Sequence, residues 1–423
     1  MRRNVILFGT LGFVGLFPPV SHAADLLYRH EHFLFSVPAS DVRNWTSSFA
    51  AWTYAGEVVT PPQRFLADGD EPPVLPPGFI RTTRPGYSIE AIKETLRRRV
   101  SENFDRPAGA VVIDKTASGS VTFDGVGLPG REVDLDALAA LTVEALERGM
   151  TDIELPVKET QPTVTVASAE LRELGIKEVV TVGESNYAGS PVNRRHNIAV
   201  GLARFNGHVI PQGTVFSFGE TLGRVDGTTG YRKELVIKGD RTEPDYGGGL
   251  CQVSSTAYRG VWEHGFPIEQ RINHSYAVSY YGPQGTDATV YPPNPDMKFT
   301  NDGPSALLIQ THHDERDHAY FVYYGTKDAR ESSVYGPFVW NRTAAPPDRT
   351  LTTTELAPGQ RRKVGDRHPG MTAAWVRYTT LADGTKLEEP VISIYQARPL
   401  FYEVGVAEEA APPIDEAPSW IDA

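Results

Sequence analysis

The chain has 423 residues, of which 22% are charged and 40% are hydrophobic, as in a soluble globular protein. Its length exceeds that of one ordinary core, so we expect several domains. The formal net charge of −12 argues against a nucleic-acid partner. The 39 glycines and 33 prolines predict many turns, and therefore a multidomain, β-rich α+β architecture.

The first 23 residues have the parts of an export signal. Arg2 and Arg3 precede the apolar run VILFGTLGFVGLF, and the sequence SHA at 21–23 is a small-x-small cleavage site. The apolar run is too short to span a bilayer comfortably, and no later run reaches that length. We predict a cleaved signal peptide over 1–23, export to the periplasm or extracellular cell envelope, and no transmembrane anchor.

Two segments are expected before the central region. Residues 24–87 are an N-terminal extension with a proline-rich loop. Residues 88–167 read as a compact α+β domain whose helices begin after Ser88 and Asp134, both good N-cap residues, and the second helix ends at Gly149. This domain carries no obvious nucleophile or metal-ligand cluster, so we expect it to bind or to act as a spacer.

The run NRRHNIAVGLARFNG predicts a helix that begins near Asn193. Asn193, Arg194, Arg195 and His196 gather at its entry. In one interpretation Asn193 is a cap and the arginines are solvated. In the other, the arginines and the helix N–H groups form a binding site for an anion or carboxylate.

The run GGGLCQVSSTAY, residues 247–258, contains the only cysteine of the chain. A single cysteine cannot form an internal disulfide, and an exported chain seldom keeps a free thiol without a use. At a helix start the N–H groups and the helix dipole favour the thiolate, so Cys251 is the candidate nucleophile. The alternative is a buried cysteine that acts as a small hydrophobe.

Further residues follow from this placement. The glycine turn supplies backbone N–H groups for an oxyanion, and we expect substrate contacts from the residues around the cysteine, namely Gly247, Gly248, Gly249, Gln252, Ser254 and Ser255.

A cysteine nucleophile needs a base and a group that orients the base. His274 is predicted on the next strand and Asp287 at the start of the strand after it, so antiparallel pairing would bring His274 beside the thiol. The order of glycine, cysteine, helix, histidine and aspartate is similar to the layout of papain-like and transglutaminase-like enzymes. In the alternative interpretation, His274 is an ordinary polar residue of a strand and Asp287 is a residue of a turn.

No metal or cofactor is predicted. His312 and His313 are adjacent on a predicted strand and therefore face opposite sides, so the polar run up to His318 reads as an exposed hairpin tip. Residues 348–406 are expected to form a small all-β module, and the acidic tail 407–423 is expected to be disordered. The sequence carries no signal for an oligomeric state.

The phrases NRRHNIAVGLARFNGHVIPQGTVFSF, GYRKELVIKGD, GGGLCQVSSTAY, RINHS and GTDATV resemble the VanW family, named from vancomycin-resistance gene clusters. The resemblance covers residues 183–325, with small departures at Gln212 and Ala257. It implies an envelope location and a connection with peptidoglycan or a cell-wall peptide, and it supplies no established activity.

Two flanking segments also resemble cell-wall modules. The phrases FDRPAGAVV and GREVDLDALAALTVEAL, within 88–167, are similar to the peptidoglycan-binding domain that accompanies VanW domains and some L,D-transpeptidases. The phrase DGTKLEEPVISIYQARPLFYEVG, within 348–406, resembles small β modules appended to cell-wall proteins.

Two functions follow as hypotheses. The first is a thiol hydrolase or acyltransferase acting on cell-wall peptides, with Cys251 attacking, His274 as base and Asp287 as its orienting group. The second is a non-catalytic peptidoglycan-binding or scaffold protein linked to envelope maintenance or glycopeptide resistance. Redox sensing is the weaker alternative, because no second cysteine is present to resolve an oxidised thiol.

Overall fold

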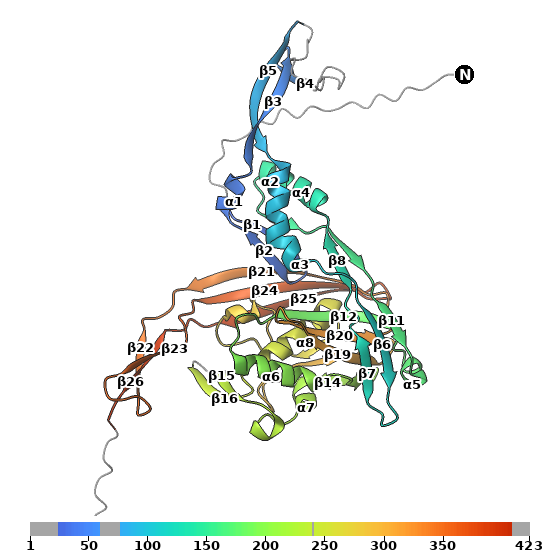
Figure 1. Cartoon of the computed structure of the whole chain (residues 1–423), viewed down its shortest axis with the longest axis vertical. Coiled ribbons are helices and arrows are strands. Elements are labelled where there is room, and N and C mark those ends of the chain that lie inside the picture. The colour runs from blue at the N-terminus through green and yellow to red at the C-terminus, as the bar shows by residue number, and fades with distance from the viewer. Residues whose placement is uncertain (1–23, 60–76, 239–240, 408–423) are drawn as a thin grey trace, which may run out of the picture. The chain divides into compact units, whose positions relative to one another are not determined.

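The computed structural model describes residues 24–59, 77–238 and 241–407. This part of the chain divides into two compact units, residues 24–107 with 130–160, and residues 108–129 with 161–407. Both units are rich in strands and also contain helices, which confirms a multidomain, β-rich α+β chain (Figure 1). The predicted signal peptide and nearly all of the predicted acidic tail lie outside the described residues.

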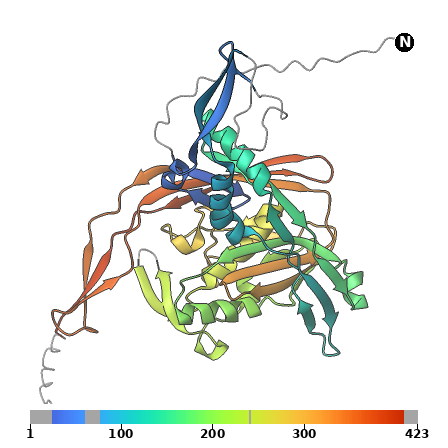
Figure 2. The same cartoon turned by 45° about the horizontal axis from the view of Figure 1, so that its top comes forward.

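The first unit contains three small sheets, with strand orders β2-β1-β9, β4-β3-β5 and β10-β8. The β3 and β5 strands form a long twisted ribbon, drawn in blue (Figure 2). The elements are β1 (Leu26–His30), β2 (Phe33–Val37), α1 (Ala39–Arg43), β3 (Thr46–Tyr54), β4 (Glu57–Val59), β5 (Phe79–Tyr87), α2 (Ile89–Leu96), η2 (Arg97–Ser101), α3 (Glu102–Phe104), β8 (Gly130–Val133), α4 (Leu135–Arg148), β9 (Asp152–Glu154) and β10 (Val157–Thr160).

The predicted helix caps of this unit are confirmed. The side chain of Ser88 accepts a hydrogen bond from the Ala91 N–H at the start of α2. The side chain of Asp134 accepts one from the Ala137 N–H at the start of α4, and Gly149 ends α4 in the left-handed conformation. The two helices pack on one core, in which the largest fully buried side chain is Trp45.

The second unit contains a short sheet and the central domain. Its first elements are β6 (Ala110–Lys115), β7 (Val121–Gly125), β11 (Thr163–Val166), α5 (Ala169–Glu173), β12 (Glu178–Asn186), α6 (Val192–Ala203), β13 (Val209–Ile210), β14 (Val215–Ser217), α7 (Phe218–Leu222), η3 (Gly227–Thr229), β15 (Lys233–Lys238), β16 (Arg241–Tyr246) and α8 (Leu250–His264).

The remaining elements of this unit are mainly strands. They are β17 (Ile268–Gln270), η4 (Ser279–Tyr281), β18 (Lys298–Thr300), β19 (Leu307–His313), β20 (His318–Gly325), β21 (Glu331–Thr343), β22 (Arg349–Thr353), β23 (Arg361–Val364), β24 (Gly370–Thr380), β25 (Lys386–Tyr395) and β26 (Phe401–Gly405).

Helix α8 packs directly on the central sheet, whose strand order is β12-β20-β19-β13. Two glycines allow this close approach, because a Cβ on Gly183 of β12 would lie 1.9 Å from the carbonyl oxygen of Thr256 on α8. The facing glycine on α8 is Gly260, whose carbonyl accepts a hydrogen bond of 2.9 Å from the Thr181 hydroxyl. The helix and the sheet share the largest core of the chain.

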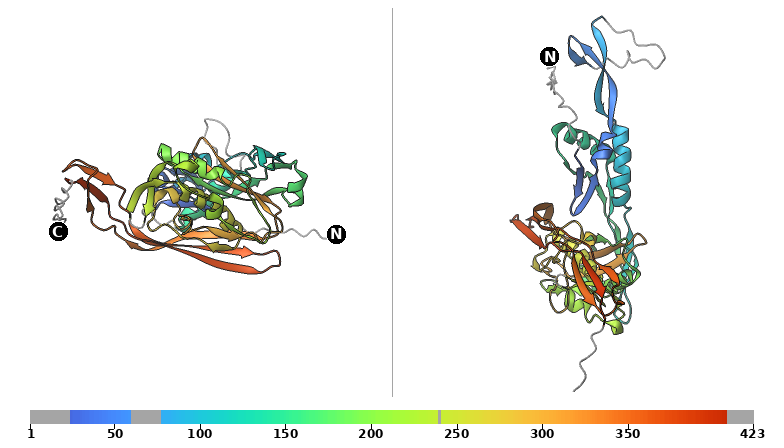
Figure 3. Two further views of the ribbon diagram at one scale, coloured as in Figure 1. Left: turned by 90° about the horizontal axis from the view of Figure 1, so that it is seen from below. Right: turned by 90° about the vertical axis from the view of Figure 1, so that its left-hand side faces the viewer.

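A second sheet, β21-β24-β25, lies along one side of the second unit (Figure 3, left). It joins the core of α8 through Trp375, which is fully buried. Arg377 donates hydrogen bonds to the carbonyl oxygens of Trp262 and Phe266, at 2.8 and 2.9 Å. Much of the segment 348–406 therefore shares a core with the central domain, and β22, β26 and β23 form a sheet of their own.

The segment 88–167 is divided between the two units. Strands β6, β7 and β11 form one sheet of the second unit, where Val111 and Ile113 are buried in one core with Tyr324. The predicted strands around His274 and Asp287 are absent, because residues 271–278 and 286–291 carry no strand assignment. The backbone there is held by side chains, as in the bonds from Arg259 to the carbonyls of Tyr281 and Gly282.

Candidate active site

Cys251 lies in the first turn of α8, as its position after three glycines predicted. The helix begins after Gly249, whose φ of 118° suits glycine, and a Cβ there would lie 3.1 Å from the carbonyl oxygen of Arg194. The side chain of Cys251 is half-buried, and in its protonated form the thiol donates a long hydrogen bond, 3.6 Å, to the carbonyl oxygen of Val290. The N–H groups and the dipole of the first helical turn favour a thiolate at this place.

His274 and Asp287 form a buried pair in the loops that follow β17. Each residue is 2% exposed, and Nδ1 of His274 lies 2.6 Å from Oδ2 of Asp287. The backbone N–H of His274 donates to the same oxygen at 2.7 Å. Since Asp287 accepts from Nδ1, this nitrogen keeps a proton, and Nε2 is the atom that gains or loses the second proton of the ring.

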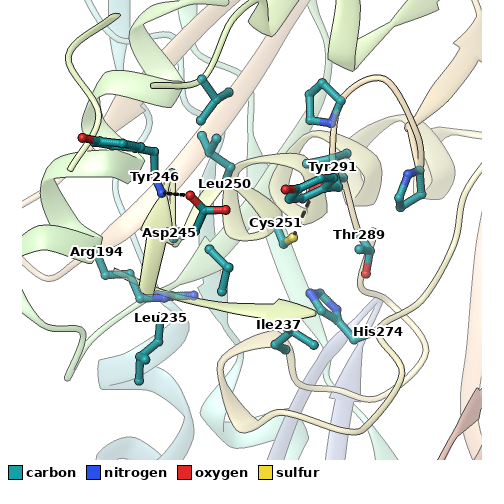
Figure 4. A pocket seen from close by; sticks show the side chains of 18 of the residues that line it. Arg194, Leu235, Ile237, Asp245, Tyr246, Leu250, Cys251, His274, Thr289 and Tyr291 are labelled. Atoms are coloured by element: carbon teal, nitrogen blue, oxygen red, sulfur yellow. Dashed lines mark hydrogen bonds between the residues drawn. The ribbon is translucent and has the colours of Figure 1, made fainter. Parts of the chain in front are cut away.

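Nε2 of His274 is buried and has no hydrogen-bond partner among the described residues. Figure 4 shows that the imidazole of His274 and the sulfur of Cys251 point into the same pocket. The imidazole is fixed from one side by the ring of Tyr281, which stacks on it at a centroid distance of 4.1 Å and an angle of 10°. A basic nitrogen is therefore held over the pocket that the thiol lines.

The pKa shifts of the three groups describe a charged site. Burial acts to raise the pKa of the Cys251 thiol, but the interaction with His274 outweighs it and the pKa is lowered. Burial acts to lower the pKa of His274, but Asp287 and Cys251 raise it to about 9. Burial likewise opposes ionisation of Asp287, yet its bonds to His274 hold the pKa of this carboxyl well below its usual range. These directions favour a thiolate, an imidazolium and a carboxylate at neutral pH.

The pocket has a volume of about 710 Å³ and a mixed lining. One wall is the β15–β16 hairpin, which presents Leu235, Val236 and Ile237, with Asp245 and Tyr246 on the returning strand (Figure 4). The opposite wall is formed by segments near the two ends of the His274–Asp287 region, namely Asn273, Ser275, Thr289, Val290, Tyr291, Pro292 and Pro295.

Four of the predicted binding residues line this pocket, the three glycines 247–249 and Arg194. Arg194 is buried and held in place by bonds from its guanidinium to the Ser190 hydroxyl, 2.6 Å, and to Oε1 of Gln252, 3.0 Å. Its charge also packs over the ring of Tyr280 at 4.3 Å. Arg194 therefore contributes a fixed positive charge to the wall.

The other six predicted binding residues are engaged elsewhere. Asn193 donates to the carbonyl of Lys233, Arg195 pairs with Asp317, and a ring nitrogen of His196 lies 2.8 Å from the Gly230 carbonyl oxygen. These three contacts replace the predicted anion site at the helix entry, from which only Arg194 reaches the pocket.

Gln252, Ser254 and Ser255 are fully buried behind the cysteine. Nε2 of Gln252 donates to the Ser185 hydroxyl at 2.9 Å. The two serines hold the loop that carries Asp287: Ser254 donates to the carbonyl of Ala288 at 2.5 Å, and Ser255 accepts from its N–H at 2.9 Å. These three side chains therefore hold the backbone and side chains around the site in place and do not face the pocket.

Several residues of the site were missed by the sequence analysis. Arg271 and Tyr395 both bond to Oδ1 of Asp287, and Tyr281 stacks on His274. Arg271 belongs to the phrase RINHS, so its nearness to His274 was a usable signal. Tyr395 lies 108 residues after Asp287, and no local pattern could pair the two.

Asp314 and His318 are hydrogen-bonded to each other within the β19–β20 turn, with Nδ1 and Oδ2 3.1 Å apart. Across the described ranges, no three His, Cys, Asp or Glu side chains lie close enough to hold a metal ion. None of the helices in the described part of the chain has the length and apolarity that crossing a bilayer requires.

Comparison with known proteins shows what the region of this site is similar to. A model of the VanW like protein family matches residues 193–323, which include the cysteine, the histidine and the aspartate. The uncharacterized protein YoaR of Bacillus subtilis (strain 168) is 34% identical over 167 residues, which cover 38% of this chain and 52% of that protein. The match thus spans about half the length of the relative. Residues 193–323 of this chain, which carry the candidate site, are therefore similar to the VanW like protein family.

Proposed function

We propose that the protein is a cysteine-dependent acyl-transfer enzyme, in which Cys251 attacks a carbonyl carbon and His274 moves the protons. One observation carries this proposal: the buried His274–Asp287 pair directs an unpartnered Nε2 into the pocket that the Cys251 thiol also lines. A nucleophile, a base and an orienting carboxylate are the groups that such a reaction requires.

The reaction follows from these groups. The Cys251 thiolate forms a bond to the carbonyl carbon of an amide or ester, and N–H groups of the first turn of α8 stabilise the oxyanion. The imidazolium of His274 gives its proton to the leaving amine or alcohol as the carbon–heteroatom bond breaks, which leaves a thioester. Water or an acceptor amine then gives a proton to Nε2 and attacks the thioester, so that an acid or a new amide is released, the sulfur leaves as a thiolate, and the thiolate–imidazolium pair is restored.

We assign the substrate to the peptides of the cell wall. The predicted export signal and the resemblance to the VanW family support this assignment, because each of them implies an envelope location. The pocket volume of about 710 Å³ is in the range of pockets that bind a drug-sized ligand. We further assign wall binding to the first unit, on the resemblance of its phrase GREVDLDALAALTVEAL to peptidoglycan-binding domains.

The pH dependence of alkylation tests the charged site. The full chain is treated with iodoacetamide between pH 4 and 10, and the adduct on Cys251 is followed by intact mass. An ordinary thiol reacts with a midpoint near pH 8.5. We expect a lower midpoint for Cys251 and a second change near pH 9, where His274 loses its proton. A profile with a single midpoint near pH 8.5 would contradict the proposal.

The matched control is a pair of histidine variants. His274→Gln should move the midpoint toward that of an ordinary thiol, since the imidazolium that stabilises the thiolate is gone. His264, at the other end of α8, is also mostly surrounded by protein, and its burial lowers its pKa to about 4. His264→Gln should leave the midpoint unchanged.

The substrate class is tested with soluble peptidoglycan fragments that carry stem peptides. After rapid acid quenching, the mass of the full chain should increase by the mass of an acyl fragment, and Cys251→Ala should show no increase. Sedimentation with insoluble peptidoglycan separates binding from catalysis, because we expect both proteins to sediment equally. Absence of any adduct, together with sedimentation of both proteins, would leave the non-catalytic wall-binding function.

A further inference from the structure

We propose that β25, which lies outside the family-matched domain, completes the active site, and that Tyr395 is a positioning residue for Asp287. This inference rests on the proposed function, because Asp287 is the group that orients His274. It concerns residues beyond position 323, where the family match ends. Three kinds of contact support it: a hydrogen bond from β25 to the Asp287 carboxylate, an arginine that bonds to both β25 and Asp287, and hydrogen bonds between β25 and the loop that carries His274.

The hydroxyl of Tyr395 donates a hydrogen bond of 2.5 Å to Oδ1 of Asp287. The same oxygen of Tyr395 accepts a bond of 2.7 Å from the backbone N–H of Gly285. Tyr395 is only 4% exposed, and its burial and the charge of Asp287 raise its pKa, so that the phenol stays protonated and donates. One side chain of β25 thus binds both the catalytic carboxylate and the loop that leads to it.

Arg271 is held by the same strand. Its Nη2 lies 3.1 Å from Oδ1 of Asp287, and its Nε donates to the Asp287 carbonyl oxygen at 2.6 Å. On the other side, Nη1 donates to the hydroxyl of Ser393 on β25 at 2.7 Å. With Tyr395 and Arg271 on Oδ1, and the imidazole and backbone of His274 on Oδ2, each carboxylate oxygen has two donors. The carboxylate has no free direction in which to rotate.

The loop that carries His274 is also bound to β25 on both sides of the histidine. The Asn273 side chain donates to the carbonyl oxygen of Ile394 at 2.9 Å, and the N–H just after the strand, on Gln396, donates to the Ser275 carbonyl at 2.7 Å. The imidazole and the carboxylate therefore take their positions from one strand. Neither Tyr395 nor Ser393 lines the pocket, so both act through Asp287 and not on the substrate.

The test is Tyr395→Phe in the full chain, which removes the hydroxyl and keeps the ring. The Asp287 carboxylate then loses one of its four hydrogen-bond donors and can rotate. The imidazolium of His274 is therefore held less firmly by the carboxylate. We expect the thiol pKa of Cys251 to rise by about one unit, which lowers the alkylation rate by iodoacetamide below the midpoint about tenfold. The downfield proton resonance of His274 Nδ1–H should also broaden or move upfield.

Tyr378→Phe is the matched control, because Tyr378 lies on β24 of the same sheet and is 43% exposed. It should keep the wild-type midpoint and the wild-type resonance. Ser393→Ala is a second, milder variant that loosens Arg271 alone, and we expect a smaller change in the same direction. Thermal unfolding of each variant shows that the measurement is made on folded protein.

Asp287→Asn separates the failure of this inference from the failure of the proposed function. If Asp287→Asn raises the thiol pKa and neither Tyr395→Phe nor Ser393→Ala does, the positioning role of β25 is wrong and the Cys251 site stands. If Asp287→Asn also leaves the wild-type pH profile unchanged, both the inference and the proposed function are wrong.

Discussion

Asp287 receives two hydrogen bonds from His274 through a single carboxylate oxygen, one from the imidazole at 2.6 Å and one from the backbone N–H at 2.7 Å. The backbone bond fixes the position of the carboxylate relative to the main chain, and the imidazole bond then fixes the direction of the ring. The direction of Nε2 toward the pocket is thus determined by two bonds that share one acceptor.

Asp287→Asn should strongly weaken the orientation of the His274 imidazole. The asparagine amide keeps the size of the carboxylate but loses its charge, and an amide N–H facing Nδ1 would favour the wrong tautomer of the imidazole. We expect the thiol pKa of Cys251 to rise by about two units, so that alkylation at low pH falls about a hundredfold. The pH profile of iodoacetamide labelling measures this. A wild-type profile in Asp287→Asn would contradict both the role of the carboxylate and the proposed function.

The stability of the protein in acid should depend on Asp287. Its folded-state pKa is held below the ordinary value of about 3.9, so the folded state binds this proton less readily than the unfolded state. Its contribution to the free energy of unfolding is present above about pH 4 and is lost as the pH falls toward the folded-state pKa.

Urea unfolding at pH 5 and pH 3 tests this dependence. The wild-type protein should lose more stability between the two pH values than Asp287→Asn does. Asp124, an exposed carboxylate on β7, offers the control, and Asp124→Asn should keep the wild-type loss. Equal losses in wild type and Asp287→Asn would contradict the buried ionised carboxylate.

Gly249→Ala should damage the start of α8. A side chain is disfavoured at a φ of 118°, and the added Cβ would press on the Arg194 carbonyl oxygen. We expect a loss of about 1–3 kcal/mol in the free energy of unfolding, from strain of this kind. Gly189→Ala, at a positive φ with open space around its Cβ, measures the backbone effect without the clash. A loss no larger than that of Gly189→Ala would show that the helix start tolerates the contact.

Gln252→Met tests whether this side chain supports the site or takes part in it. Its bonds to Arg194 and Ser185 are buried, so their loss should cost about 1–3 kcal/mol of stability. Because Gln252 does not line the pocket, the pH profile of Cys251 alkylation should remain as in the wild type. A variant of normal stability with an altered profile would return Gln252 to the substrate-binding site predicted from the sequence.

The sequence allowed the identity of the three central residues to be predicted, but not their surroundings. A lone cysteine after three glycines, followed by a histidine and an aspartate, led to Cys251, His274 and Asp287 as candidates, and the structure pairs His274 with Asp287 beside the pocket that Cys251 lines. The burial of Gln252 was missed because successive residues of a helix point about 100° apart, so the residue next to the pocket-lining Cys251 faces the core.

The predicted strands failed for a different reason. The run INHSYAVSYYG alternates as a strand would, but the guanidinium groups of Arg259 and Arg271 take backbone carbonyls in this region, including those of Tyr281 and Asp287. Hydrogen bonds from these two arginine side chains therefore take the place of the backbone hydrogen bonds of a sheet. The role of Tyr395 depends on how β25 packs, and local patterns carry no information on that.

The half-buried thiol at the pocket wall has a practical consequence for finding the substrate. Because the chain has one cysteine, every thiol-directed reagent reports on this pocket alone, and no other cysteine adds background to the spectrum. A captured acyl group can therefore be weighed on the intact chain, and its mass identifies it directly. Under the proposed function, the protein would capture its acyl donor from an unfractionated digest of cell walls.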